Sequence, residues 1–190
     1  MALVERKKNR NKDKSIALLN KCLSLHVQST KGVKAGFEFY IKLNPDFLLE
    51  LAKEFVQHIG IKQLQPGEKV PPFLGKAIKL LENVTKQNSG FTEAQLLLAK
   101  SRWAAGDNAG ALKELQNCMQ VDPNLTEAQI LSAMINLNSG SYKAAETNLH
   151  QAFSQDFKIR NNPLFMLIKS EVEMKNEEYR QALGTLEAAF

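Results

Sequence analysis

The residues that could carry chemistry are few and lie far apart in the sequence. The histidines at positions 26, 58 and 150 have no Cys or carboxylate at the spacing that a metal site requires. Cys22 and Cys118 are each predicted to fill the small buried position of a helix, where a free thiol packs as a small apolar side chain. Residues 106–110 lack the Lys and Ser or Thr of a phosphate-binding loop. The sequence therefore predicts no catalytic residue, no metal, no cofactor and no enzyme.

Composition indicates a helical chain with its basic charge at one end. The 190 residues are 44% hydrophobic and contain only 10 Gly and 6 Pro, which favours long helices around a core. No apolar run approaches the length of a membrane span, and two Cys favour a reducing compartment. Of the net charge of +5, most lies in residues 1–14. We expect residues 1–12 to form a basic, disordered tail and, because aromatics are not interleaved with basic residues, no nucleic-acid binding.

A repeat of 34 residues is the strongest pattern. Residues 92–95 (TEAQ) recur unchanged at 126–129, and ten of the 34 aligned positions are identical, against about two by chance. The other identities are Leu97 with Leu131, Ala99 with Ala133, Gly106 with Gly140, Ala111 with Ala145, Leu115 with Leu149, and Asp122 with Asp156. Small residues at fixed positions allow two helices to approach closely, and each Gly marks the turn between them.

This pattern resembles the tetratricopeptide repeat, a helix–turn–helix unit. We predict repeats at 92–125, at 126–159 and, truncated by the end of the sequence, at 163–190. Residues 13–91 are predicted to hold divergent helical repeats, with helices near 13–26, 44–58 and 72–87 and a long loop at 60–70. The fold class is all-α: an α-α superhelix, or solenoid, of antiparallel helix pairs. A natural array ends in a polar capping helix, so the chain is interpreted as an internal fragment.

Three segments also resemble one particular family. They are KLNPDFLLELAKEF at 42–55, the QPG loop at 65–67 and DFKIRNNPLFMLIKSE at 156–171. They are similar to the ciliary tetratricopeptide-repeat subunit of intraflagellar transport complex A, the tetratricopeptide repeat protein 21 family. The resemblance implies a protein-binding scaffold of the retrograde transport train. It also implies other complex subunits as partners, and the cytoplasm, cilium and ciliary base as location.

A partner-binding groove is expected along the first helix of each repeat. In this repeat type the second, fifth, ninth and twelfth positions of that helix line the concave surface. Leu164 falls among them, and the main candidates are Leu96, Lys100, Trp103, Ile130, Met134, Leu137, Leu167, Glu171 and Met174. Such an apolar groove would take a partner helix or an extended apolar segment. The alternative is that the first helices are rotated, which would put Leu96 and Trp103 in the core.

Two other functions are consistent with the repeats. One is a generic adaptor for chaperones or other assemblies. A chaperone adaptor clamps a partner's carboxylate with Lys, Asn and Arg, yet Leu96, Leu131, Leu164 and Ile168 occupy the corresponding positions. The other is the repeat region of a larger enzyme. Neither the immediate partner nor the length of the parent protein follows from the sequence.

Overall fold

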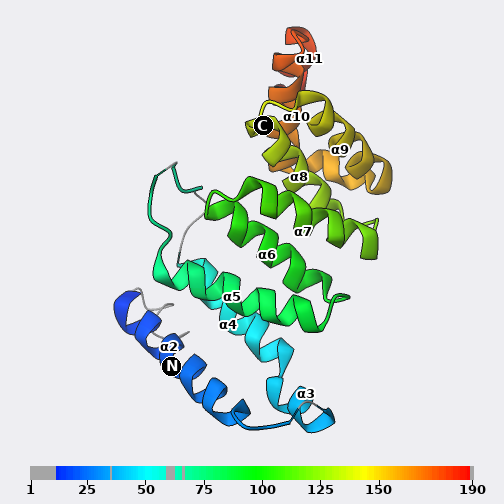
Figure 1. The fold of residues 1–190 in the computed structure, drawn as a ribbon. Coiled ribbons are helices and arrows are strands. Elements are labelled where there is room, and N and C mark those ends of the chain that lie inside the picture. Colours follow the sequence, from blue (N-terminus) through cyan, green and yellow to red (C-terminus); the bar gives the residue numbers. More distant parts are fainter. Residues whose placement is uncertain (1–11, 35, 59–62, 66, 189–190) are drawn as a thin grey trace. The chain divides into compact units, whose positions relative to one another are not determined.

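The structure, a computed structural model, describes residues 12–34, 36–58, 63–65 and 67–188 (Figure 1). All regular secondary structure in these ranges is helical, which confirms the all-α prediction. The chain divides into two compact units, 1–107 and 108–190, and each is described by itself. This division falls between the two helices of the repeat predicted at 92–125, and the predicted repeat boundaries stay predictions. Apart from Lys12, the tail predicted at 1–12 lies outside the described residues.

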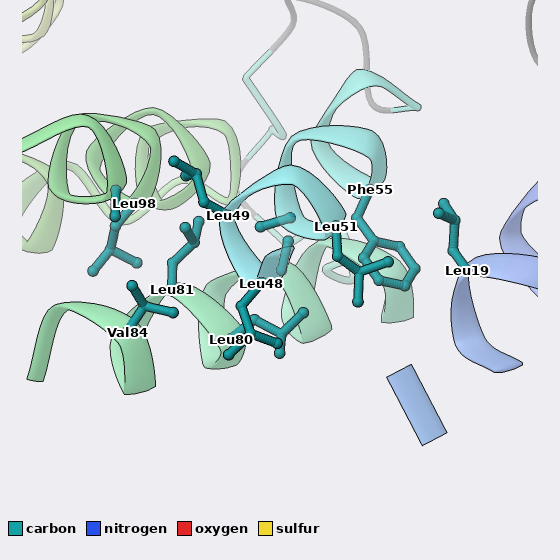
Figure 2. Packing of buried hydrophobic residues seen from close by; sticks show 12 residues of the cluster. Leu19, Leu48, Leu49, Leu51, Phe55, Leu80, Leu81, Val84 and Leu98 are labelled. Carbon is teal, nitrogen blue, oxygen red and sulfur yellow. The ribbon is translucent and has the colours of Figure 1, made fainter. Parts of the chain in front are cut away.

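The first unit is built around two packed pairs of helices, α4 with α5 and α5 with α6. Its helices are α2 (Lys12–Thr30), α3 (Phe37–Leu43), α4 (Pro45–Gln57), α5 (Pro72–Gln87) and α6 (Thr92–Ala104). Figure 2 shows the core, in which Leu19 of α2 faces Phe55 of α4, and Leu81 of α5 lies close to Leu98 of α6. Because α2, α4, α5 and α6 all contribute, this core joins helices far apart in the sequence.

Asn44 forms the joint between α3 and α4. It adopts the left-handed conformation, with φ of 43°, which Asn tolerates better than most residues. Its backbone N–H donates to the carbonyl of Tyr40 and so ends α3, while its side-chain oxygen accepts from the N–H of Phe47 at 3.1 Å. Pro45 then supplies the first residue of α4, where a missing N–H costs nothing. One residue therefore caps two helices, and the chain turns sharply between them.

The long loop before α5 is fastened to the end of α6. The N–H of Leu64 donates to the carbonyl of Ala104 at 2.9 Å. Ala104 lies in the last turn of α6, where backbone carbonyls have no hydrogen-bond partner within the helix. A turn follows, in which the N–H of Glu68 donates to Gln65 and Gly67 takes a φ of +90°. The described part of the predicted 60–70 loop is thus held by backbone hydrogen bonds, one to α6 and one within its own turn.

The described part of the second unit contains two helix pairs, preceded by a single helix. Its helices are α7 (Asn108–Val121), α8 (Thr126–Asn138), α9 (Tyr142–Gln155), the 3-10 helix η1 (Phe157–Asn161), α10 (Pro163–Lys175) and α11 (Tyr179–Glu187). α8 packs against α9 and α10 against α11. The core of this unit includes Ile130, Leu149, Phe165 and Val172. Helices and turns thus follow the order that the repeat predicts.

The repeat identities have the predicted structural roles. Ala99, Ala111, Ala133 and Ala145 are all completely buried, so none of these positions has room for a larger side chain. Gly106 and Gly140 take φ values of 87° and 78°. At the second of these turns the N–H of Ser141 donates to Asn136 at 2.8 Å, which closes a Schellman motif at the end of α8.

Three features differ from the sequence predictions. Helix α3 and the 3-10 helix η1 were not predicted, because both are short and neither carries a period long enough to recognise. Cys22 was predicted to be buried but is exposed. The face of helix α2 that meets the core carries Ser15, Leu19 and Leu23, at intervals of four residues, and Cys22 lies to the side of that face. Cys118 is buried, as predicted.

Candidate partner-binding surfaces

The predicted groove residues are divided between the two units, and each part is considered by itself. In the first unit Leu96 is 6% exposed, while Lys100 and Trp103 are partly buried. In the second unit Ile130 and Leu137 lie within the packed core, and Met134 packs against it. These two core side chains are therefore not available to a partner. The groove as a whole stays a prediction.

The part of the predicted groove that lies open is on α10. Leu164, Leu167 and Met174 are 45%, 48% and 45% exposed, and Glu171 is partly buried among them. Their spacing of three and four residues places them along one face of the helix, which we call the α10 stripe. The opposite face carries Phe165 and other core side chains. An apolar stripe that remains outside a filled core is a typical protein contact surface.

The first unit has an exposed apolar surface that sequence analysis missed. Helix α3 buries no side chain, and Phe37, Tyr40 and Ile41 are 83%, 56% and 62% exposed. The signal was present in the sequence, since residues 37–43 (FEFYIKL) are rich in aromatic and branched side chains. The exposed surface was missed because a run of aromatic and branched residues is also typical of a buried segment. The sequence alone does not show which of the two it is.

A second missed feature is a groove in the second unit, between α9, α10 and α11. It encloses about 720 Å³ and is lined by apolar side chains such as Leu149 and Phe165, with charged residues at its ends. We call it the α9–α11 groove. The sequence held an indirect signal, since the linker before α10 is about three residues longer than the repeat requires, and these residues form part of η1.

Two titratable groups, Cys118 and Lys53, have shifted pKa values, and both shifts have a structural cause. Burial raises the pKa of the Cys118 thiol to about 11, so this thiol stays protonated and unreactive at neutral pH. Hydrogen bonds to Glu50 and Glu93 raise the pKa of Lys53. Its ammonium lies 2.7 Å from Glu50 of the same helix and 2.6 Å from Glu93, and the second contact joins α4 to α6. No cluster of His, Cys, Asp or Glu in the described ranges could hold a metal ion. Across the same ranges, every helix is too short or too polar to cross a membrane.

Comparison with known proteins gives one consistent family. The family profile "Tetratricopeptide repeat protein 21 second ARM domain" matches residues 1–140, and "Tetratricopeptide repeat protein 21 ARM repeat" matches residues 157–190. Human tetratricopeptide repeat protein 21B is 34% identical over the whole chain, and mouse tetratricopeptide repeat protein 21A is 30% identical over 97% of it. The chain spans only 14% of the length of these relatives.

Solved structures share the fold at low sequence identity. A crystal structure of MamA superposes with a TM-score of 0.69 over the whole chain and 92% of MamA, at 15% identity. TTC0263, a thermophilic tetratricopeptide-repeat protein of Thermus thermophilus, superposes with a TM-score of 0.63 at 14% identity, covering 99% of this chain and 86% of its own. These likenesses show the helix-pair fold alone. Since the two family profiles together match nearly all of the sequence, the chain belongs to the tetratricopeptide repeat protein 21 family.

Proposed function

We propose that the chain is a section of a scaffold subunit of intraflagellar transport complex A, which holds other subunits of the complex together for retrograde transport in the cilium. The observation that carries this proposal is the 34% identity to human tetratricopeptide repeat protein 21B along the entire chain. The aligned length contains the α3–α4 turn at Asn44, a local geometry that an ordinary repeat does not need. The proposed location is accordingly the cytoplasm, the cilium and the ciliary base.

The surfaces of the chain suit a scaffold. A repeat is stabilised mainly by its neighbours, so its outer faces can vary without loss of the fold. On α10 the stripe of Leu164, Leu167 and Met174 remains exposed beside a filled core. The stripe offers apolar contact area with one carboxylate, Glu171, and this combination favours an apolar helix over an acidic tail. We propose that this exposed part of the predicted groove contacts a partner subunit.

Affinity purification from ciliated cells tests the proposal. The tagged chain should enrich subunits of complex A, as measured by quantitative mass spectrometry. Replacing Leu167 and Met174 together with Glu should reduce that enrichment, because charges would then enter the apolar contact. The control variant Lys175→Glu changes an exposed charge on the same helix and should leave the enrichment unchanged.

The outcomes separate the alternatives. Enrichment of chaperones without complex A subunits would favour the general adaptor. Enrichment of a single enzyme would favour the repeat region of a larger catalytic assembly. Enrichment of complex A subunits that is the same for the wild type and the double Glu variant would keep the scaffold role but contradict the α10 stripe. No enrichment of complex A subunits would contradict the proposed function.

Trp103 fluorescence tests the other end of the predicted groove. Strong quenching by acrylamide would place this side chain on an open surface, and full protection would place it in the core. Its partial burial predicts an intermediate quenching constant.

A further inference from the structure

The α9–α11 groove has an apolar floor and a wall of small residues. Leu149 of α9 and Phe165 and Val172 of α10 form part of the floor. On the α11 side the groove is bordered by Gly184 and by Ala188, the C-cap residue of that helix, which are four residues apart and therefore lie on one face. With a volume of about 720 Å³, the groove is large enough for the side chains of several helical turns of a bound segment.

The two ends of the groove carry opposite charges. Arg160 precedes α10 and Glu178 follows it, and the 13 residues of α10 separate them by about 20 Å. The rings of Phe153, late in α9, and Phe165, early in α10, are 6.5 Å apart, so the end of α9 lies beside the start of α10. Glu146, early in α9, also lines the groove, and its carboxylate lies 3.8 Å from the His150 ring. The groove is basic at the start of α10 and acidic at its end.

The charges at these ends are available to a bound segment. In the part of the chain that the structure describes, neither Arg160 nor Glu178 has an ion-pair partner. Charges in the middle are already matched, because the Lys169 ammonium lies 3.5 Å from Glu173, whose other oxygen accepts from the Thr185 hydroxyl at 2.8 Å. Arg160 and Glu178, at the two ends of α10, are therefore the charges placed to select an occupant.

A helix fits this groove better than an extended segment. The backbone groups of α9, α10 and α11 bond within their own helices, so an extended segment would lose water from its amides without gaining partners. A helix satisfies its own backbone and needs only apolar contact. The absence of side-chain atoms at Gly184 lets the backbone of such a helix approach α11 closely.

We propose that the α9–α11 groove binds an amphipathic α-helix of a partner protein, with an apolar face on the groove floor, an acidic side chain at Arg160 and a basic side chain at Glu178. The inference rests on the proposed scaffold role only in taking the helix from another protein. It concerns a different surface from the α10 stripe, since the groove and the stripe occupy different faces of α10.

Gly184 offers a direct test with a matched control. A Cβ added at Gly184 meets no atom within 4 Å, so a larger side chain can enter the groove without displacing the fold. Gly184→Leu should fill part of the groove and weaken binding about tenfold or more, whereas Gly184→Ala should retain most of the affinity. Neither substitution should lower the melting temperature, because both residues form helix better than Gly does.

The probe is a fluorescein-labelled synthetic helix of about 14 residues, which spans about 21 Å. It carries Leu along one face, Glu in one half and Lys in the other. A second peptide has the same composition with Glu and Lys mixed between the halves, and a third has a central Pro that breaks the helix. Fluorescence polarisation with the purified 190-residue chain should show the charge-separated helix binding about fivefold more tightly than the mixed one, and more tightly still than the Pro peptide.

Charge variants locate the two ends. Arg160→Glu and Glu178→Lys should each weaken the charge-separated peptide severalfold. Lys175→Glu and Glu187→Lys change exposed charges on α10 and α11 outside the groove, and they should leave the affinity within about twofold.

Three results would overturn the proposal. Equal affinity of Gly184→Leu and Gly184→Ala would mean that the peptide does not occupy the groove. Binding of the charge-separated peptide no tighter than that of the Pro peptide would exclude a helical ligand. A wild-type dimer that becomes monomeric in Gly184→Leu, measured by sedimentation, would make a second copy of this chain the occupant. Because these assays use synthetic peptides and no other subunit of complex A, their failure leaves the purification test of complex A intact.

Discussion

Two neighbouring helix pairs of the second unit, α8–α9 and α10–α11, follow one plan with different results. Ala145 and Ala182 hold equivalent positions, 37 residues apart, and both are buried. Leu149 is 5% exposed, yet its equivalent Leu186 is only partly buried. The α8 helix buries residues along most of its length, while α10 leaves Leu164 and other stripe residues exposed. The first pair is thus closed by its neighbours, and the second leaves apolar surface free.

The turns and linkers show where the pairs diverge. Gly140 ends α8 with a positive φ at little cost, but Glu177 takes the same conformation at the end of α10, with φ of 65°. The N–H of Glu178 still donates to the backbone carbonyl of Glu173 at 2.9 Å. The same kind of cap therefore forms, although Glu177 tolerates a positive φ less well than Gly does. The longer linker, with η1, precedes α10 and adjoins the α9–α11 groove. Small departures from a repeat can therefore leave an open groove without changing the fold.

Truncation of the equivalent leucines gives the largest expected effect. Leu149→Ala should cost about 2–5 kcal/mol of unfolding free energy, because it opens a cavity in the core. Leu186→Ala should cost less than the lower end of that range, since this side chain already contacts water. Urea denaturation of both variants measures the difference. Equal losses would show that α11 is as tightly packed as α9.

Enlarging the small contact residue is expected to have the next largest effect. Ala145→Leu should cost about 1–3 kcal/mol, because the completely buried site between α8 and α9 would be overpacked. The neighbouring Ala144→Leu places the same side chain on the exposed face and should change stability by less than about 0.5 kcal/mol. A denaturation midpoint that is unchanged in Ala145→Leu would contradict the packing described here.

Exchanges at the two turns should have opposite signs. Gly140→Ala should destabilise by about 1 kcal/mol, because a side chain is strained at this positive φ. Glu177→Gly should instead stabilise by about 0.5–1 kcal/mol, because it removes the same strain from the end of α10. Thermal unfolding of the two single variants checks the sign. A destabilised Glu177→Gly would show that the Glu177 side chain contributes more than its backbone strain costs.

The two cysteines should differ in reactivity. Titration of Cys118 should have almost no effect on the free energy of unfolding at neutral pH. Cys22 is exposed and should react quickly with a thiol reagent at pH 8, whereas Cys118 should react only on unfolding. Burial raises the pKa of Cys118 from its ordinary value of 9.0 to about 11. The unfolded chain then loses this proton at lower pH than the folded chain, so stability should fall as the pH rises from about 9 to about 11. Cys118→Ala should lose this part of the pH dependence.

Sequence analysis succeeded where a residue type has one structural explanation. The 34-residue identities predicted the order helix, turn, helix along the chain for α6 and α7 and for α8 and α9, since Gly106 and Gly140 are typical of a helix end with a positive φ. Pro45 and Pro72 marked helix starts for the same kind of reason. Helix α3 was missed because seven residues are too few to show a period. Cys22 was placed in the core because a small residue at a repeat position does not reveal whether a neighbour covers it.

The candidate site was less accessible to sequence reasoning. Helical spacing predicts one face for Leu164, Leu167 and Met174, and all three are exposed. The same reasoning grouped Ile130 and Leu137 with them, and these two are core residues. The α9–α11 groove could not be predicted at all, because it depends on how three helices are spaced.

The sequence by itself therefore determined the helical class, the repeat length and the positions of the small residues and turns. These properties depend on backbone preferences and on spacing along a single helix, and both are local. Tertiary structure alone decided which apolar residues are covered, because burial depends on the neighbours that a face meets. Leu149 and Leu186 make the point, since the same side chain at the same repeat position is buried in one pair and partly open in the next.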